Sequence, residues 1–269
     1  MPPPPPRLEV PTALLAKSEE IQRSLEPCVD LFPEPSGPGA PPSLTRLFGR
    51  PSLRHVGDWP RTPEGRPMLF VAQANLEDVR MAGGEAASAL PETGLLSLFF
   101  DLDAESLGDD PDDTYRFRLV WTPDIATCRV TPPPAGAPKF DGVEKRLRPG
   151  AGWRLPPESD ARFSLGQLEE VEFRAYAELA TGLAATEHQL LGHPFWLAAD
   201  ARAQCAAAAG RLWGGGAAAA SDWRLLWQVG GDSTLSGAFG DEVQLYVMIQ
   251  ERDLLERRFL RSWLVLQRG

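Results

Sequence analysis

The chain has 269 residues, of which 43% are hydrophobic, 9% aromatic and 24% charged. This composition is typical of a globular protein and excludes a disordered or fibrous one. The 27 Lys and Arg residues against 37 Asp and Glu residues give a net charge of −10, and such a field repels phosphate backbones and anionic lipids. We therefore expect neither nucleic acid nor a membrane surface as a partner.

No segment has the pattern of a membrane span or an export signal. The longest uncharged apolar runs, residues 94–100 and 243–249, are far shorter than the roughly 20 residues that span a bilayer. The first residues show no basic region followed by an apolar one, which predicts a cytoplasmic protein. Three widely spaced cysteines, Cys28, Cys128 and Cys205, make neither a disulfide framework nor a zinc pair, so we expect reduced, core-compatible thiols.

Residues 1–43 are predicted to form a proline-rich arm, a helix and a connector ahead of the main domain. The prolines at positions 2–6 impose an extended arm, because each ring fixes φ and removes a donor. We interpret the arm as a solvated tail, with a ligand for an aromatic groove as the alternative. An apolar stripe predicts a helix over residues 12–28, and the Pro, Gly and Ser residues at 32–42 indicate a connector.

From residue 44 onward the sequence predicts one β-rich domain of the α+β class, with antiparallel strands and a few packed helices. Short apolar runs between turn signals predict strands at residues 68–74, 95–102, 115–121, 243–249 and 263–267. Helical patterns cover residues 165–187 and 198–209, and Gly210 is expected to end the second. We predict a domain over residues 44–269, with half-repeats at about 44–120 and 190–269 joined by a mainly helical insert at about 160–188.

The two half-repeats carry the same ordered succession of residue types, which composition alone rarely produces. Each has a Gly-x-Pro turn, a buried strand that ends in glutamine, a Gly-led strand and a following Asp-Leu pair. The first copy places these at Gly49, Pro51, Gln73, Gly94, Asp101 and Leu102, and the second at Gly192, Pro194, Gln228, Gly240, Asp253 and Leu254. We expect the two copies to pair around a common interior.

The two strand-ending glutamines are the most informative polar residues of the repeat. Simple alternation would put Gln73 on the face of Val71 and Gln228 on the face of Leu226. A buried amide left unpaired costs about 1–3 kcal/mol, so each glutamine needs partners. We favour an amide that bridges backbone groups of the adjacent turn. The open alternative is that both glutamines line a ligand cleft between the halves.

The ordered succession resembles the YwqG-like proteins, a bacterial family of unknown function. It comprises the two Gly-x-Pro turns, Trp59-Pro60, Gln73, Leu90-Pro91 before Gly94-Leu95, Leu226-Trp227-Gln228, Asp232-Ser233, Gly240-Asp241, Asp253-Leu254 and Phe259. The resemblance covers residues 44–267 and implies an α+β fold with two β-rich repeats and no established activity. Both turns lack the second glycine of the typical Gly-Gly-x-Pro pattern, which puts in doubt any role that needs its backbone freedom.

Motifs for catalysis and for metal or cofactor binding are missing from the sequence. His188 and His193 are five residues apart, which does not place them on one helix face, so we interpret His193 as a turn residue and expect no metal and no cofactor. In the acidic stretch 101–113, Ser106 and Asp112 stand at the sixth and twelfth positions, where a calcium loop needs Gly and Glu. We interpret this stretch as a solvated loop, with weak cation binding as the alternative. Nucleophile elbows and phosphate loops are also absent.

These observations leave two main functional hypotheses, and a purely structural scaffold as a third. The first is a noncatalytic cytoplasmic module whose acidic surface binds a protein partner, such as a basic toxin or effector that it neutralises. The second is a small-molecule binding protein or hydrolase with a cleft between the half-repeats. The candidate ligand-binding residues are Trp59, Gln73, Trp227, Gln228, Asp232 and Asp241. Core packing is the alternative interpretation of the tryptophans.

Overall fold

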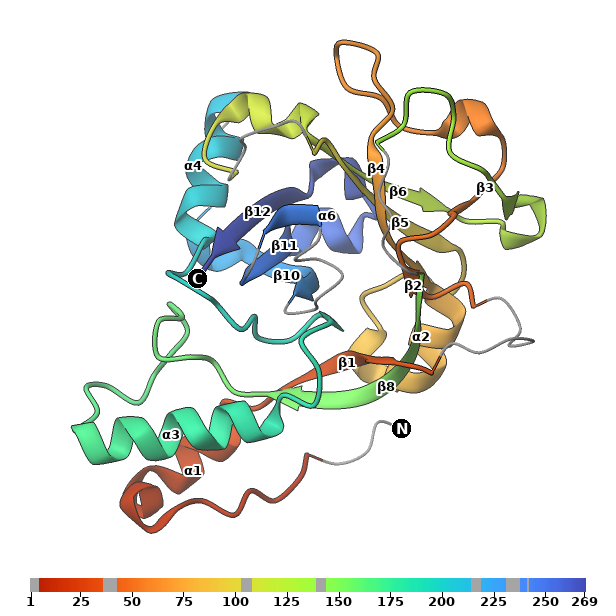
Figure 1. Ribbon diagram of the computed structural model, residues 1–269. Helices are drawn as coiled ribbons and strands as arrows, with labels where there is room; N and C mark the ends of the chain where they lie inside the picture. Colours follow the sequence, from red (N-terminus) through yellow and green to blue (C-terminus); the bar gives the residue numbers. More distant parts are fainter. Residues whose placement is uncertain are drawn as a thin grey trace.

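The computed structural model describes residues 5–35, 43–102, 108–138, 144–213, 219–230, 238–240 and 242–269. Within these residues the strands form a curled, antiparallel, ten-stranded sheet in the order β12-β11-β10-β9-β1-β8-β2-β4-β5-β6. Figure 1 shows β10 to β12 and β4 to β6 as two walls, with β1 and β8 crossing beneath them. The predicted α+β class and the β-rich single domain are confirmed.

The large sheet comprises β1 (Glu26–Pro33), β2 (Arg46–Leu47), β4 (Leu69–Asn75), β5 (Leu95–Phe100), β6 (Phe117–Thr122), β8 (Lys145–Arg154), β9 (Gln189–Leu190), β10 (Trp223–Gly230), β11 (Val243–Gln250) and β12 (Trp263–Arg268). A small sheet pairs β3 (Ser52–Leu53) with β7 (Arg129–Val130). The α-helices are α1 (Ser18–Arg23), α2 (Leu76–Gly83), α3 (Glu170–Leu183), α4 (Arg202–Trp213) and α6 (Glu251–Leu255). The 3-10 helices are η1 (Thr12–Lys17), η2 (Val56–Asp58), η3 (Gly84–Ala87), η4 (Pro111–Tyr115), η5 (Ile125–Thr127), η6 (Ala220–Asp222) and η7 (Phe259–Arg261).

The five predicted strands are confirmed as β4, β5, β6, β11 and β12, and the two predicted helices beyond residue 160 as α3 and α4. The expectation that Gly210 ends the second helix is wrong, because α4 runs on to Trp213. A glycine inside a helix costs only about 1 kcal/mol. The contact between the rings of Trp213 and Trp263, with centroids 6.2 Å apart, offsets that cost.

The helix predicted over residues 12–28 is partly wrong. Residues 12–23 are helical in η1 and α1, but Glu26–Pro33 forms β1, a central strand of the sheet that pairs with both β8 and β9. Pairing on both edges overrides the helical pattern, and it buries Cys28, Val29 and Leu31. The start of the predicted connector therefore lies in β1, whereas residues 36–42 and the first four residues of the arm lie outside the described residues.

The sheet consists of two matching groups of four strands that flank β1 and β8. The group β2-β4-β5-β6 has the same order along the chain and across the sheet as β9-β10-β11-β12. Each Gly-x-Pro turn begins with two residues at positive φ, which are Phe48 (52°) and Gly49 (76°) in the first group and Leu191 (62°) and Gly192 (73°) in the second. The predicted similarity of the two ends thus extends to the backbone.

Both glutamine strands contain a β-bulge, which corrects the predicted face of the glutamines. The register of β4 shifts between Phe70 and Ala72, and that of β10 between Leu225 and Trp227. A bulge adds one residue and reverses the alternation of faces beyond it. Gln73 therefore lies on the face opposite Val71, and the same reversal applies to Gln228.

The similarity of the two groups is weaker at the last element of the predicted repeat, the Asp-Leu pair. Asp101 directly follows β5 and accepts a hydrogen bond from Arg116 at 3.0 Å. Asp253 instead lies inside α6 and accepts one from Nε of Arg258 at 2.7 Å. The Asp-Leu pairs are therefore not structurally equivalent, although both aspartates are buried and paired with an arginine.

The curled sheet encloses one large apolar core to which both strand groups contribute. Alternate residues of β5 and β11 point into it, and the rings of Phe100 and Phe239 meet there at 5.3 Å. The outer faces are covered separately. The helix α4 packs over β10 to β12, and the segment around Trp59 packs over β4 and β5 (Figure 1). Because both faces are buried, these strands read as continuous apolar runs.

We predict that Gln73→Met and Gln228→Met each lower the free energy of unfolding by about 1–3 kcal/mol, because each leaves buried backbone groups of a turn without a partner. Urea unfolding of the purified variants measures the change. Gln167→Met is the control, because Gln167 is exposed. Equal stability of all three variants would contradict the role of the amides.

Candidate functional site

The two glutamines of the predicted site each accept a hydrogen bond from the residue that follows a Gly-x-Pro turn, but they donate to different backbone positions. The Oε1 atom of Gln73 accepts a hydrogen bond from the N–H of Ser52 at 3.1 Å, and its Nε2 donates to the Ser52 carbonyl at 3.1 Å. The Oε1 atom of Gln228 accepts from the N–H of Phe195 at 2.9 Å, and its Nε2 donates to the Glu187 carbonyl at 3.3 Å. These contacts agree with the interpretation favoured from the sequence, in which each amide bridges backbone groups of a neighbouring turn.

The other predicted site residues do not meet at one place within the described residues. Trp59 lies on the outer face, where its Nε1 donates to the Met68 carbonyl at 2.9 Å. Trp227 lies in the inner core, and the rings and aliphatic chains of both strand groups fill the space around it. Asp232 and Asp241 lie outside the described residues. The assignment of these residues to ligand binding stays a prediction.

The acidic segment and the cysteines have structural roles in the parts that the structure describes. Asp113 is buried, and its Oδ2 accepts hydrogen bonds from the N–H groups of Gly108 and Asp110 at 2.9 and 3.2 Å. The predicted thiols are confirmed as free and buried, and burial raises the pKa of Cys28 to about 12. Among the described residues, no group of three or more His, Cys, Asp or Glu side chains is placed to hold a metal ion.

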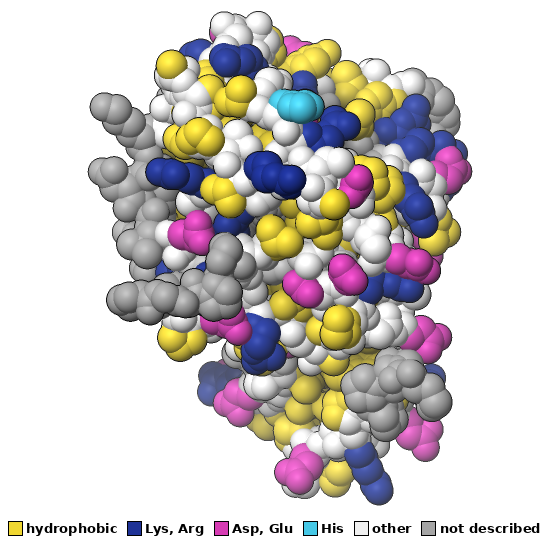
Figure 2. Space-filling model, turned by 90° about the vertical axis from the view of Figure 1, so that its right-hand side faces the viewer, with side chains coloured by type: hydrophobic (Ala, Val, Ile, Leu, Met, Phe, Trp, Pro, Cys, Tyr) yellow, Lys and Arg dark blue, Asp and Glu magenta, His cyan; other side chains and the backbone are white. Residues whose placement is uncertain are grey.

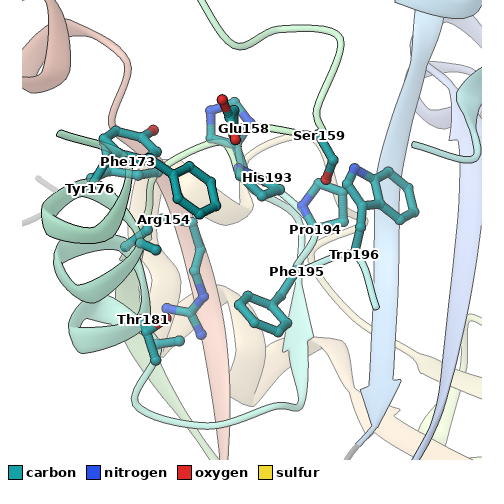
Figure 3. Close-up of a pocket in the computed structure, with 15 residues that line it drawn as sticks. Arg154, Glu158, Ser159, Phe173, Tyr176, Thr181, His193, Pro194, Phe195 and Trp196 are labelled. Carbon is teal, nitrogen blue, oxygen red and sulfur yellow. The ribbon is translucent and has the colours of Figure 1, made fainter. Parts of the chain in front are cut away.

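A cavity lies elsewhere, between α3, the end of β8 and the second Gly-x-Pro turn. Its volume is about 270 Å³, just below the range of about 300–1,000 Å³ that is usual for small-molecule sites. Figure 3 shows Phe173 and Tyr176 on α3 facing the segment that carries His193, Phe195 and Trp196. The side chains of Phe173 and Phe195 are 41% and 40% exposed, so two aromatic rings stand at its mouth.

His193 is the buried polar side chain of this cavity whose hydrogen bonding is incomplete. Its Nε2 lies 3.1 Å from the carbonyl oxygen of Ser24, and because a carbonyl only accepts, Nε2 carries the proton. In the neutral ring Nδ1 is then an acceptor, and it has no partner among the described residues. Burial lowers the pKa of His193, although Glu26, 3.7 Å away, opposes the shift.

Arg154, at the end of β8, contributes no free donor to the cavity. Its Nε donates to Gln189 at 2.7 Å, its Nη2 forms a buried ion pair with Asp30, and its remaining N–H groups bond to the carbonyls of Trp153, Leu183 and Thr186. All five N–H donors of the guanidinium are therefore used. Arg154 therefore has a structural role, because it links β8 to Asp30 on β1 and to Gln189 on β9.

The sequence interpretation placed His193 in a turn, which is correct, but did not connect it with a cavity. The first turn carries Arg50 and Ser52 where the second carries His193 and Phe195. Arg50 is exposed, whereas only 3% of His193 is exposed. The signal that could have pointed to the site is the aromatic pair Phe195-Trp196 directly after the second turn, which has no counterpart after the first.

The fold and this cavity define a duplicated α+β domain with an aromatic pocket beside its second half-repeat. The family model of a domain of unknown function (DUF1963) matches residues 45–267, and the chain belongs to this family. No curated protein matches the chain. None of the helices in the described residues is long and apolar enough to cross a membrane.

We predict that His193→Gln removes part of the loss of stability on acidification. Because burial lowers the pKa of His193 in the folded state, the unfolded chain binds more protons, so stability falls as the pH drops below about 6.5. Glutamine keeps a donor for the Ser24 carbonyl but does not titrate. Thermal unfolding of both proteins between pH 7.5 and 5 measures the difference, and parallel curves would contradict the prediction.

Proposed function

We propose that the chain is a noncatalytic protein-interaction module that binds a basic partner at the pocket between α3 and the second Gly-x-Pro turn. We place it among the YwqG-like proteins of the bacterial cytoplasm, where a toxin or effector that it neutralises is one such partner. The observation that carries the proposal is the pocket itself, in which exposed aromatic rings surround a buried histidine with an unpaired acceptor atom.

Exposed aromatic side chains around a cavity are typical of binding surfaces rather than of ordinary protein surface. Phe173 is 41% exposed on α3, and Phe195 is 40% exposed in the segment that follows the second Gly-x-Pro turn. Large aromatic side chains in such a position provide most of the binding energy of many interfaces. A partner that covers these two rings would bury their exposed apolar area.

The charge of the chain favours a basic partner through long-range attraction. The net charge of −10 raises the association rate with a cationic protein. The acidic side chains do not form a single patch on the face shown in Figure 2, where basic, acidic and apolar side chains are interspersed. The specificity of binding is therefore assigned to the pocket, and the net charge is assigned to the encounter.

Pull-down from native bacterial lysate tests the proposal, with the intact chain as bait at low and at physiological salt. We expect a stoichiometric protein to be recovered by the wild type and lost by Phe173→Ser and Phe195→Ser, because these changes remove the rings at the mouth of the pocket. Val171→Ser is the matched control, since Val171 is exposed on α3 but does not line the pocket. Failure to recover any partner, or equal recovery by all variants, would contradict the proposal.

A further inference from the structure

The pocket offers hydrogen-bond acceptors and aromatic faces, whereas most of its donors are already used. The hydroxyl of Tyr176 donates to the Pro156 carbonyl at 2.6 Å, and Nε1 of Trp196 donates to Asp160 at 3.3 Å. The guanidinium of Arg154 is saturated, as described above. Among the polar side chains of the described residues that line the cavity, only the hydroxyls of Ser159 and Thr181 remain as possible donors.

The acceptors of the pocket lie at two depths. The Nδ1 atom of His193 is buried and unpaired. At the mouth, Glu158 lines the cavity and is exposed, and its carboxylate makes no hydrogen bond or ion pair with any other described residue. A ligand that enters this pocket therefore gains most by carrying N–H donors and positive charge.

The aromatic rings favour a cation for a separate reason. The face of an aromatic ring carries negative potential, which attracts an ammonium or guanidinium group. Trp196 already shows this contact within the chain, because the guanidinium of Arg202 lies 5.5 Å from its ring centroid. Phe173 and Phe195, on opposite sides of the cavity, have faces that remain exposed (Figure 3).

We infer that the pocket binds a single arginine or lysine side chain of the basic partner, with its cation between Phe173 and Phe195 and beside Glu158. The inference rests on the proposed function and names the group that is recognised. The cavity of about 270 Å³ is small enough for one side chain. The positive charge of Arg154 does not oppose it strongly, since Asp30 neutralises that charge.

Nuclear magnetic resonance of the three histidine rings tests the inference on the full chain. The probes are n-butylguanidinium, n-butylammonium, the neutral n-butylurea and the anionic pentanoate. We expect both cations to shift the His193 resonances, and n-butylguanidinium to bind about 10-fold more tightly than n-butylurea, within the range of cation–π contacts. The resonances of His55 and His188 serve as internal controls, since neither residue lines the cavity.

Conservative variants separate the cation contact from simple apolar contact. Phe195→Leu keeps an apolar side chain but removes the aromatic face, and we expect it to weaken n-butylguanidinium binding about 2- to 30-fold while leaving n-butylurea unchanged. Glu158→Gln should weaken the cation about 2- to 5-fold, because an exposed ion pair contributes little. Val171→Ser is expected to bind both probes as the wild type does.

The result that overturns the inference is binding of n-butylurea or pentanoate as tightly as n-butylguanidinium, or no binding of either cation at the His193 resonances. Such a result leaves the proposed function standing if Phe195→Ser still loses the captured protein. The proposed function fails on its own if capture of the protein is independent of the pocket variants, whatever the probes show.

Discussion

Each half of the sheet depends on a buried glutamine amide that satisfies the backbone of a Gly-x-Pro turn. The bulges in β4 and β10 turn Gln73 and Gln228 to the outer face, where the turns run back over the strands. Leaving such a turn without its partners costs about 1–3 kcal/mol, a large share of the 5–15 kcal/mol by which a domain is stable. In the second half the N–H that Gln228 accepts from is that of Phe195, so this contact helps to hold a pocket residue in place.

The sequence predicted those parts of the fold in which local pattern and final environment agree. The strands β4, β5, β11 and β12 are apolar on both faces and are bounded by turns, so their composition was sufficient. The strand β8 was missed because it contains Pro149, Gly150 and Gly152, which local rules assign to loops. The structure requires glycine there, since a Cβ atom at Gly152 would lie 2.3 Å from Asp30 on β1. That contact joins residues far apart in the chain and leaves no local signal.

The candidate site was harder to predict, because its walls come from three separate parts of the chain. The helix α3 belongs to the segment between the halves, Arg154 ends a strand that was not predicted, and His193 belongs to the duplicated turn. The sequence repeat identified the turn correctly. A repeat, however, reveals only the residues that the two copies have in common. The pocket depends on what they do not share, namely the residues that follow the glycine in each turn.

The difference between the two turns has a physical basis in the strand beside each. In the first half Arg46 pairs with Gln73 in register, and its guanidinium bonds to both Ser52 and Gln73, so the turn is closed by a cation from its own half. In the second half Gln189 occupies the corresponding register position opposite Gln228. The cation there, Arg154, comes from β8 and is held by Asp30 and Gln189, away from the turn. The amide of Gln189 in turn donates to the carbonyls of Leu191 and His193, both at 2.9 Å. An amide therefore holds the second turn where a guanidinium holds the first, and the two copies keep the same backbone with different side-chain chemistry.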